Sequence, residues 1–387
     1  MCWTYAMTLT TLAVIMLVGL AGPVLALLPR WNVPVVIGEL FAGLLLGPTA
    51  FNFLDASEPT FTFLAEVGFG LIMFVAGSHI PVRRVDIRPA LRAGLRQSVI
   101  VGLLAIVLGV VVASLFHTHH PALYAVLITS SSAALVLPTT QALHIDGVVE
   151  LRMLAQVAIA DTACIVALPL VIDPRHATRA VIGTVALILA ALTLYLLLRA
   201  YDRSGLKDHL HEISKTRRFA LELRLNLVIL FALAALAVRM HVSILLAGFL
   251  FGMVLAAIGE PRRLARQLFA LSEGFLGPLF FVWLGASINL GELRAHPSYI
   301  ALGIALGLTA VLAHIALRLV GQPLALGALA AAQIGIPAAA ATVGSELGVL
   351  RNGEAAALLL GALVTIAVAT AGAAVSGRRA ANVENVS

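Results

Sequence analysis

The sequence predicts an all-α polytopic membrane protein with about thirteen transmembrane helices, forming a single membrane domain over residues 1–387. Hydrophobic residues make up 61% of the chain and charged residues only 11%, whereas soluble domains carry about 25% charged residues. The hydrophobic residues gather in stretches that, as helices, can cross a hydrocarbon core of roughly 30 Å. The connecting segments are short except for 200–222, so we expect no soluble regulatory domain.

Thirteen apolar stretches can be counted, and the first is interpreted as a spanning helix because it lacks the basic start of a signal peptide. Successive loops between the stretches lie on opposite sides of the membrane. The loops of one side together hold twenty of the 25 Lys and Arg residues, and the loops of the other side hold five. Basic residues are enriched on the inside of membranes, so this asymmetry predicts an N-terminus outside and a C-terminus inside. The stretches are 7–28, 33–48, 61–79, 97–115, 121–143, 151–172, 180–199, 223–239, 242–258, 274–290, 298–319, 324–345 and 354–375.

Two of these segments are poor continuous helices. The fifth contains Thr129, Ser130, Ser131 and Ser132 followed by Pro138, and the twelfth contains the run QIGIP from Gln333. Proline removes a backbone donor, and irregular backbone at membrane depth is tolerated only where it is buried in protein or lines a cavity. Interrupted helices at corresponding places in two halves indicate a transporter's binding site. Two proline-kinked structural helices are the alternative.

The position of these two segments in the chain also predicts how the halves are related. They are seven segments apart, and an odd offset means that the second enters the membrane from the opposite side. Segments four to six and eleven to thirteen are therefore expected to be inverted repeats, each with a discontinuous helix in the middle. The two discontinuous helices are expected to cross.

The sixth segment, 151–172, carries one carboxylate near its centre, Asp161, with no Lys, Arg or His within a helical turn. A charge at that depth costs about 2.5–3.5 kcal/mol even on the mildest scale, so an acid there is a functional-site hypothesis. Burial disfavours the charged form of a carboxyl group, which lets Asp161 alternate between a proton and a cation. The hydroxyls of the fifth segment, Gln333 and the backbone at Gly335 are the candidate supporting ligands.

Several stretches resemble the sodium/proton exchanger domain family, most closely its bacterial cation:proton antiporter-2 branch. The resemblance implies a homodimer in the cell membrane that exchanges Na⁺ or K⁺ for H⁺. It also implies a core of about 97–172 and 298–375 that moves like an elevator against a dimerisation scaffold of about 7–79 and 180–290. The similar stretches are VPVVIGELFAGLLLGPTAF (33–51), FLAEVGFGLIMFVAGSHI (63–80), SSSAALVLP (130–138), the region of Asp161 and FLGPLFFVWLGASINL (275–290).

The chain departs from this family at three places. Ala160 stands where many members have a first acid, and Leu308 or Thr309 stands where many have a lysine. Losing both partners of a buried ion pair can be nearly neutral, so these two losses are consistent with each other. Ile336 replaces a frequent glutamate. With one acid and no lysine, we predict electroneutral exchange, one proton for one cation. His314 is the nearest basic residue, either a proton relay or a structural histidine.

Other function classes fit less well. An aspartyl-protease-like enzyme needs two facing acids, and only Asp161 is central. No basic run with interleaved aromatic residues suggests nucleic-acid binding, and no metal site or cofactor is expected. A disulfide framework is excluded because Cys164 lies in mid-membrane. A sodium-coupled organic-solute carrier and a degenerate, non-transporting relative of the family remain the alternatives to an antiporter.

Overall fold

A computed structural model of the chain confirms an all-helical protein: every regular element among the described residues is a helix. Ten helical segments among the described residues, some made of two or more consecutive helices, are long and apolar enough to cross a membrane; two shorter helices, Val35–Leu46 and Ile244–Ile258, are also apolar. The predicted span 121–143 is divided into two helices, Pro121–Thr129 and Ala133–Ala142, and the predicted span 324–345 is divided into Leu324–Ala330 and Gly335–Glu346. The total of thirteen and the N-out orientation stay predictions. The residues described are 7–27, 35–78, 87–142, 147–172, 177–203, 221–240, 242, 244–259, 262–288, 291, 293, 297–351 and 353–384.

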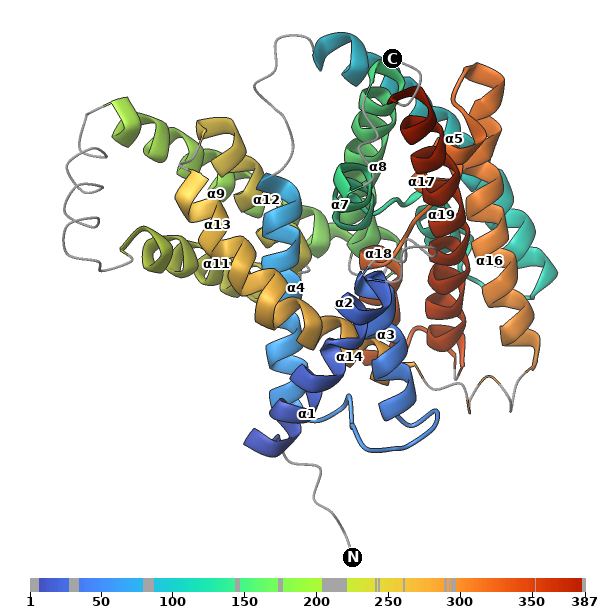
Figure 1. Cartoon of the computed structure of the whole chain (residues 1–387), viewed down its shortest axis with the longest axis horizontal. Coiled ribbons are helices and arrows are strands. Elements are labelled where there is room, and N and C mark those ends of the chain that lie inside the picture. Colours follow the sequence, from blue (N-terminus) through green and yellow to red (C-terminus); the bar gives the residue numbers. More distant parts are fainter. Residues whose placement is uncertain are drawn as a thin grey trace, which may run out of the picture. The chain divides into compact units, whose positions relative to one another are not determined.

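The chain divides into two compact units, and the first holds both predicted repeats. Figure 1 shows its helices in blue, green, orange and red. They are α1 (Leu9–Gly19), α2 (Ala21–Ala26), α3 (Val35–Leu46), α5 (Ile87–Leu115), α6 (Pro121–Thr129), α7 (Ala133–Ala142), α8 (Val148–Ile172), α16 (Pro297–Ile315), the 3-10 helix η3 (Ala316–Val320), α17 (Leu324–Ala330), α18 (Gly335–Glu346) and α19 (Glu354–Glu384).

The second unit comprises Phe63–Val85 and Arg175–Phe280. Its helices α9, α11 and α12 pack against one another, and exposed leucines such as Leu189 and Leu196 on α9 suit contact with lipid. Helices α4 and α14 run across the division between the units. The bounds are α4 (Pro59–Ser78), α9 (Ala177–Arg203), α11 (Leu221–Arg239), α12 (Ile244–Ile258), α13 (Arg262–Leu271), the π-helix η2 (Ser272–Leu276) and α14 (Gly277–Ser287).

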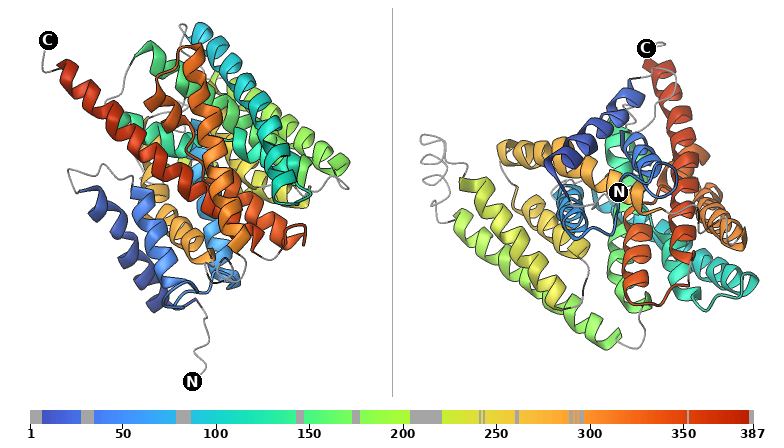
Figure 2. Two further views of the ribbon diagram at one scale, coloured as in Figure 1. Left: turned by 90° about the vertical axis from the view of Figure 1, so that its right-hand side faces the viewer. Right: turned by 90° about the horizontal axis from the view of Figure 1, so that it is seen from below.

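Each predicted repeat in the first unit is a cluster of packed helices. In one, α5 packs against α6 and α8, and in the other, α16 packs against α17 and α19; Figure 2 shows α16 and α19 side by side. Glycines allow the close approach: a Cβ at Gly109 would lie 2.8 Å from the amide nitrogen of Ala125, and one at Gly303 would lie 2.7 Å from the carbonyl oxygen of Ala357. Small residues at helix interfaces are typical of membrane proteins.

Both discontinuous helices are present, but the breaks come before the prolines. Helix α6 ends at Thr129, Ser130 is extended (φ −64°, ψ 149°), and α7 begins at Ala133. In the second, α17 ends at Ala330 and α18 begins at Gly335. Pro337 therefore falls in the first turn of α18, where a missing N–H is tolerated, and it does not interrupt a helix.

Two helices extend further than their apolar stretches predict. Helix α5 begins at Ile87, ten residues before the predicted start at 97, and α19 continues to Glu384, beyond the predicted end at 375. The added turns of α5 carry exposed Arg92 and Arg96. Hydropathy marks only the part of a helix that lies in hydrocarbon, and polar turns beyond it continue the same helix. Residues 204–220 of the predicted loop 200–222 lie outside the described residues, as does Cys2.

Candidate ion-binding site

Helix α8 brings Asp161 to the place where both discontinuous helices meet it. Asp161 lies about half-way along α8 and is buried, with 4% of its surface exposed. Helices α6 and α7 of the first repeat and α17 and α18 of the second all pack against α8. Figure 1 shows α8 in green between these elements. Half-helices from both discontinuous segments thus pack against the helix that carries Asp161.

The carboxylate of Asp161 faces the start of the half-helix α7. Its Oδ2 accepts a hydrogen bond of 3.0 Å from the backbone N–H of Ala133, the first residue of α7. A helix N-terminus carries unpaired N–H groups and a partial positive charge, which stabilise an anion. This is the one hydrogen bond to the carboxylate among the described residues, and no cationic side chain bonds to it there; the N–H offsets part of the cost of burying the charge.

The hydroxyls beside the first break donate to backbone within their own helix. Thr129 Oγ1 donates to the carbonyl of Ala125 at 2.8 Å, and Ser130 Oγ donates to the carbonyl of Leu127 at 2.9 Å. A hydroxyl that donates a hydrogen bond still has lone pairs on its oxygen, and hard cations prefer oxygen ligands. Ser132 is buried with 2% of its surface exposed.

Ser131 makes the contact that links the two breaks. Its Oγ donates to the carbonyl of Ala330 at 2.7 Å, which is the last residue of α17. The same oxygen lies 3.1 Å from Nε2 of His314, near the end of α16. All the groups involved are buried, and His314 has no exposed surface. The predicted neighbour of the site, His314, is thus attached to the first break rather than to Asp161.

The second break contains Gln333, which is also buried. Its backbone N–H donates to Thr365 Oγ1 of α19 at 3.3 Å, and its side-chain Nε2 has no partner among the described residues. Gly335 begins α18 and is buried. Within the described residues, no hydrogen bond joins Asp161 to Gln333 or to the four hydroxyl residues 129–132.

Sequence reasoning missed three groups at this site: the N–H of Ala133, the carbonyl of Ala330 and the hydroxyl of Thr365. The first two belong to alanines, whose side chains give no sign of a polar role. Thr365 is a single threonine in an apolar helix, and it is fully buried. No group of three or more His, Cys, Asp or Glu side chains able to hold a metal was found in the described part of the chain.

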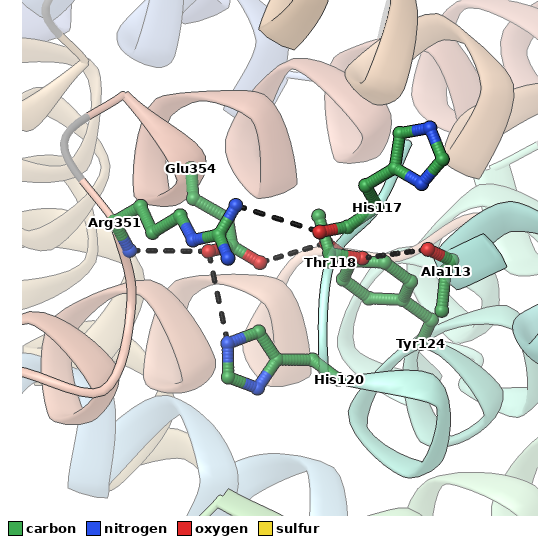
Figure 3. A network of polar contacts seen from close by, with 7 residues as sticks. All are labelled: Ala113, His117, Thr118, His120, Tyr124, Arg351 and Glu354. Carbon is green, nitrogen blue, oxygen red and sulfur yellow. Dashed lines mark hydrogen bonds and ion pairs between the residues drawn. The ribbon is translucent and has the colours of Figure 1, made fainter. Parts of the chain in front are cut away.

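A second polar network lies at the start of α19, away from Asp161 along the sequence. Figure 3 shows Glu354, which is fully buried, among Tyr124, His120 and the loop at Arg351. Tyr124 donates to Glu354 Oε1 at 2.7 Å, and the N–H of Arg351 donates to Oε2 at 3.1 Å. His120 Nε2 lies 3.8 Å from Oε2. We call this network the Tyr124–Glu354 clasp; it joins α6 of one repeat to α19 of the other.

Comparison with known proteins decides the family. The sequence model of the transmembrane sodium/hydrogen exchanger family matches residues 12–375, which is nearly the whole chain. The chain belongs to the sodium/hydrogen exchanger family. This confirms the resemblance drawn from the sequence motifs and identifies a multi-pass protein of the cell membrane. Members of the sodium/hydrogen exchanger family are transporters, not enzymes.

Individual relatives of this chain are distant. A putative Na⁺/H⁺ antiporter of Bacillus subtilis, YjbQ, is 24% identical over 92% of this chain and 61% of its own length. The glutathione-regulated potassium-efflux protein KefC of Klebsiella pneumoniae is 25% identical over 74% of this chain and 46% of its own. The chain thus spans about half to three fifths of the length of these two proteins. A probable Na⁺/H⁺ antiporter of Methanocaldococcus jannaschii is 25% identical over 84% of this chain and 86% of its own.

A solved structure shares the fold of this chain. The sodium proton antiporter MjNhaP1 from Methanocaldococcus jannaschii matches 96% of this chain and 98% of its own with a TM-score of 0.70 and 18% identity. At that identity the match supports the fold alone. The predicted all-α fold class agrees with this neighbour.

Proposed function

We propose that the protein is a secondary active antiporter that exchanges a monovalent cation, Na⁺ or K⁺, for H⁺, with both competing for the carboxylate of Asp161. The observation that carries the proposal is the placement of Asp161. It is a buried acid, its one hydrogen bond among the described residues comes from the N–H of Ala133, and helices of both breaks pack against its own helix. Family membership supports cation and proton as the substrates.

Competition at one carboxylate is sufficient for obligatory exchange. The empty site carries a negative charge, which is costly to move through an apolar environment. A bound proton or a bound monovalent cation neutralises that charge, so only the loaded forms cross between the two faces of the membrane. The lone pairs of Thr129, Ser130, Ser131 and Ser132 and the carboxamide of Gln333 are the proposed neutral ligands around the cation, and the backbone at Gly335 is the proposed edge of the site.

The descriptions of the relatives support a monovalent cation but do not choose between Na⁺ and K⁺. Two of them are described as Na⁺/H⁺ antiporters and one as a potassium-efflux protein. All three descriptions support a monovalent cation over an organic solute. We therefore test Na⁺, K⁺ and Li⁺ separately.

The proposed transport cycle also needs a moving part and a fixed part. We assign the moving core to about 97–172 and 298–375, which contain both breaks and Asp161, and the scaffold of a homodimer to about 7–79 and 180–290. Light scattering of the detergent-purified protein tests the dimer, with a mass of two chains of 40.5 kDa expected after subtraction of detergent. A single-chain mass at every concentration would contradict it.

The deciding experiment measures dissipation of a pH gradient in proteoliposomes after addition of each cation in turn. The wild type is expected to respond to Na⁺ or K⁺, and Asp161→Asn to neither, because the amide binds neither a proton nor a cation strongly. Ala158→Ser, three residues earlier on the same helix, is a matched control for the effect of a polar change in α8. Full exchange by Asp161→Asn would overturn the mechanism, and no exchange by the wild type would favour a solute carrier or a non-transporting relative.

A further inference from the structure

His314 shares one hydroxyl group with the second break. The hydroxyl oxygen of Ser131 lies 2.7 Å from the carbonyl oxygen of Ala330 and 3.1 Å from Nε2 of His314. The other ring nitrogen, Nδ1, lies 2.9 Å from the carbonyl oxygen of Ala310, one turn back on α16. Ser131 stands two residues before Ala133, whose N–H holds Asp161. The ring is therefore connected through one residue to the break that holds the ion-binding acid.

Counting protons over these three contacts shows that they cannot all be satisfied when His314 is neutral. A carbonyl oxygen only accepts, so Nδ1 must donate to Ala310 and Ser131 must donate to Ala330. In a neutral ring that has its proton on Nδ1, Nε2 is an acceptor. The one hydroxyl proton of Ser131 is used in the hydrogen bond to Ala330, so no proton is available for a hydrogen bond between Oγ of Ser131 and Nε2 of His314. A protonated ring donates from both nitrogens and satisfies all three contacts.

The end of one helix lies beside the His314 ring and offsets part of the cost of charging a buried side chain. His314 lies in the last turn of α16, and through Ser131 it is linked to the last residue of α17. Helix α17 ends there, whereas α16 continues directly into η3; a helix C-terminus carries a partial negative charge that stabilises a nearby cation. The helices are also held close together, because a Cβ at Gly327 of α17 would lie 2.9 Å from the carbonyl oxygen of His314.

Other titratable groups on the packed elements do not take these contacts. The elements against α16 are α5, α6, α17, α19 and η3; α17 has no titratable residue. Among the described side chains of the others, Arg92, Arg96 and Arg318 are exposed, while Tyr124 and Glu354 bond each other. Asp161 and Cys164 are the titratable groups in the membrane part of α8, which packs against α6 and α17. Within the described part, the ring's hydrogen-bond partners are the hydroxyl of Ser131 and the carbonyl oxygen of Ala310.

We propose that His314 is a positioning residue whose protonation closes the Ser131 link between the two discontinuous helices and so sets the pH range in which the Asp161 site is ordered. This inference rests on the proposed function. The proton on His314 is retained during exchange and is not among those transported. When His314 loses its proton, the ring and the carbonyl of Ala330 compete for the single proton of Ser131. Ser131 then keeps a hydrogen bond to only one of these two partners.

The transport arm of the test compares pH profiles of exchange at saturating cation. In His314→Gln the side-chain amide donates a hydrogen bond at every pH. The pH at which the exchange rate falls to half on the alkaline side should therefore rise by about one unit or more, which is a tenfold lower proton concentration. Ser131→Ala lacks the link and should keep, at all pH values, the lower rate that the wild type has at alkaline pH. The double variant should match Ser131→Ala, because residues that act through one contact are not additive. His119→Asn, an exposed loop histidine, should match the wild type.

The spectroscopic arm does not depend on transport. In reconstituted protein with ¹⁵N-labelled histidine rings, the signal lost in His314→Gln identifies His314. It should change with pH from a ring protonated on Nδ1 alone to one protonated on both nitrogens, and at a given pH a larger share should be neutral in Ser131→Ala. A His314 ring that stays neutral wherever the protein is folded, or pH profiles with unchanged midpoints in both variants, would overturn the inference. A wild type that shows the ring titration but no exchange would instead remove the proposed function.

Discussion

Ala133 and Asp161 are joined by a hydrogen bond of 3.0 Å between the first N–H of α7 and Oδ2 of the carboxylate. The acid is thus held by a helix terminus, which supplies only partial charge. A full positive charge from a lysine would compete with a transported cation for the same carboxylate. This arrangement leaves the charge of Asp161 to be balanced by what binds there, and charge balance is the first property to test.

Exchange is expected to be electroneutral. One carboxylate binds either one proton or one monovalent cation, and Ala160, next to it, offers no second acid. Proteoliposomes with the same K⁺ and pH gradients are compared without valinomycin, at zero potential, and with valinomycin, at an inside-negative potential. The initial rate of Na⁺-driven pH change should be the same in both. A steady current on a solid-supported membrane that reverses with the cation gradient would contradict this stoichiometry.

A second acid beside Asp161 should destabilise the protein. Ala160 is buried, with 1% of its surface exposed, and no cationic side chain contacts Asp161 within the described residues. In Ala160→Asp the new carboxyl has no partner, and an unpaired polar group in an apolar environment costs about 1–3 kcal/mol or more. The thermal midpoint of the purified protein should fall, and Ala160→Ser is the control for size. An unchanged midpoint in Ala160→Asp would mean that a partner is within reach.

Much of this site could be predicted from the sequence because its signals are chemical exceptions in an apolar chain. Asp161, the hydroxyl run from Thr129 and the QIGIP run all stand out against their surroundings. The partners of these groups do not stand out, because they are backbone atoms of Ala133 and Ala330. Their roles depend on where the breaks fall, and a position between helices far apart in sequence has no local signature.

The same reasoning explains the misplaced cause of the breaks. Pro337 is a strong signal for a helix interruption, yet α18 begins at Gly335 and accommodates it in the first turn. At the first break, Ser130 is extended and Pro138 lies inside α7. The breaks were located to within a few residues, whereas the exact turning points depend on contacts such as the one between Ser131 and Ala330.

Two glycines of α5 should respond in opposite directions to the same change. A Cβ at Gly109 would lie 2.8 Å from backbone atoms of both Ala125 and Pro121, whereas one at Gly102 would meet only Thr129 Cγ2, at 4.0 Å. Gly109→Ala must push α6 away and should lower the thermal midpoint. Gly102→Ala should leave it unchanged or raise it, since alanine favours a helix over glycine by about 0.5–1 kcal/mol. Equal effects in the two variants would show that α5 and α6 do not pack this closely.

The Tyr124–Glu354 clasp should contribute to stability and not to ion selectivity. Tyr124 and Glu354 both have no exposed surface, and the hydroxyl donates to the carboxylate at 2.7 Å across 230 residues of sequence. Tyr124→Phe removes the donor and leaves Glu354 Oε1 short of a partner, a loss that costs about 1–3 kcal/mol for a buried group. The thermal midpoint should therefore fall more than in the control Tyr195→Phe, whose hydroxyl accepts a bond from Arg199 at an exposed site.

The apparent cation affinity of Tyr124→Phe in proteoliposomes should equal that of the wild type, because the clasp has no contact with Asp161 among the described residues. A changed affinity with an unchanged midpoint would place the clasp in the transport path.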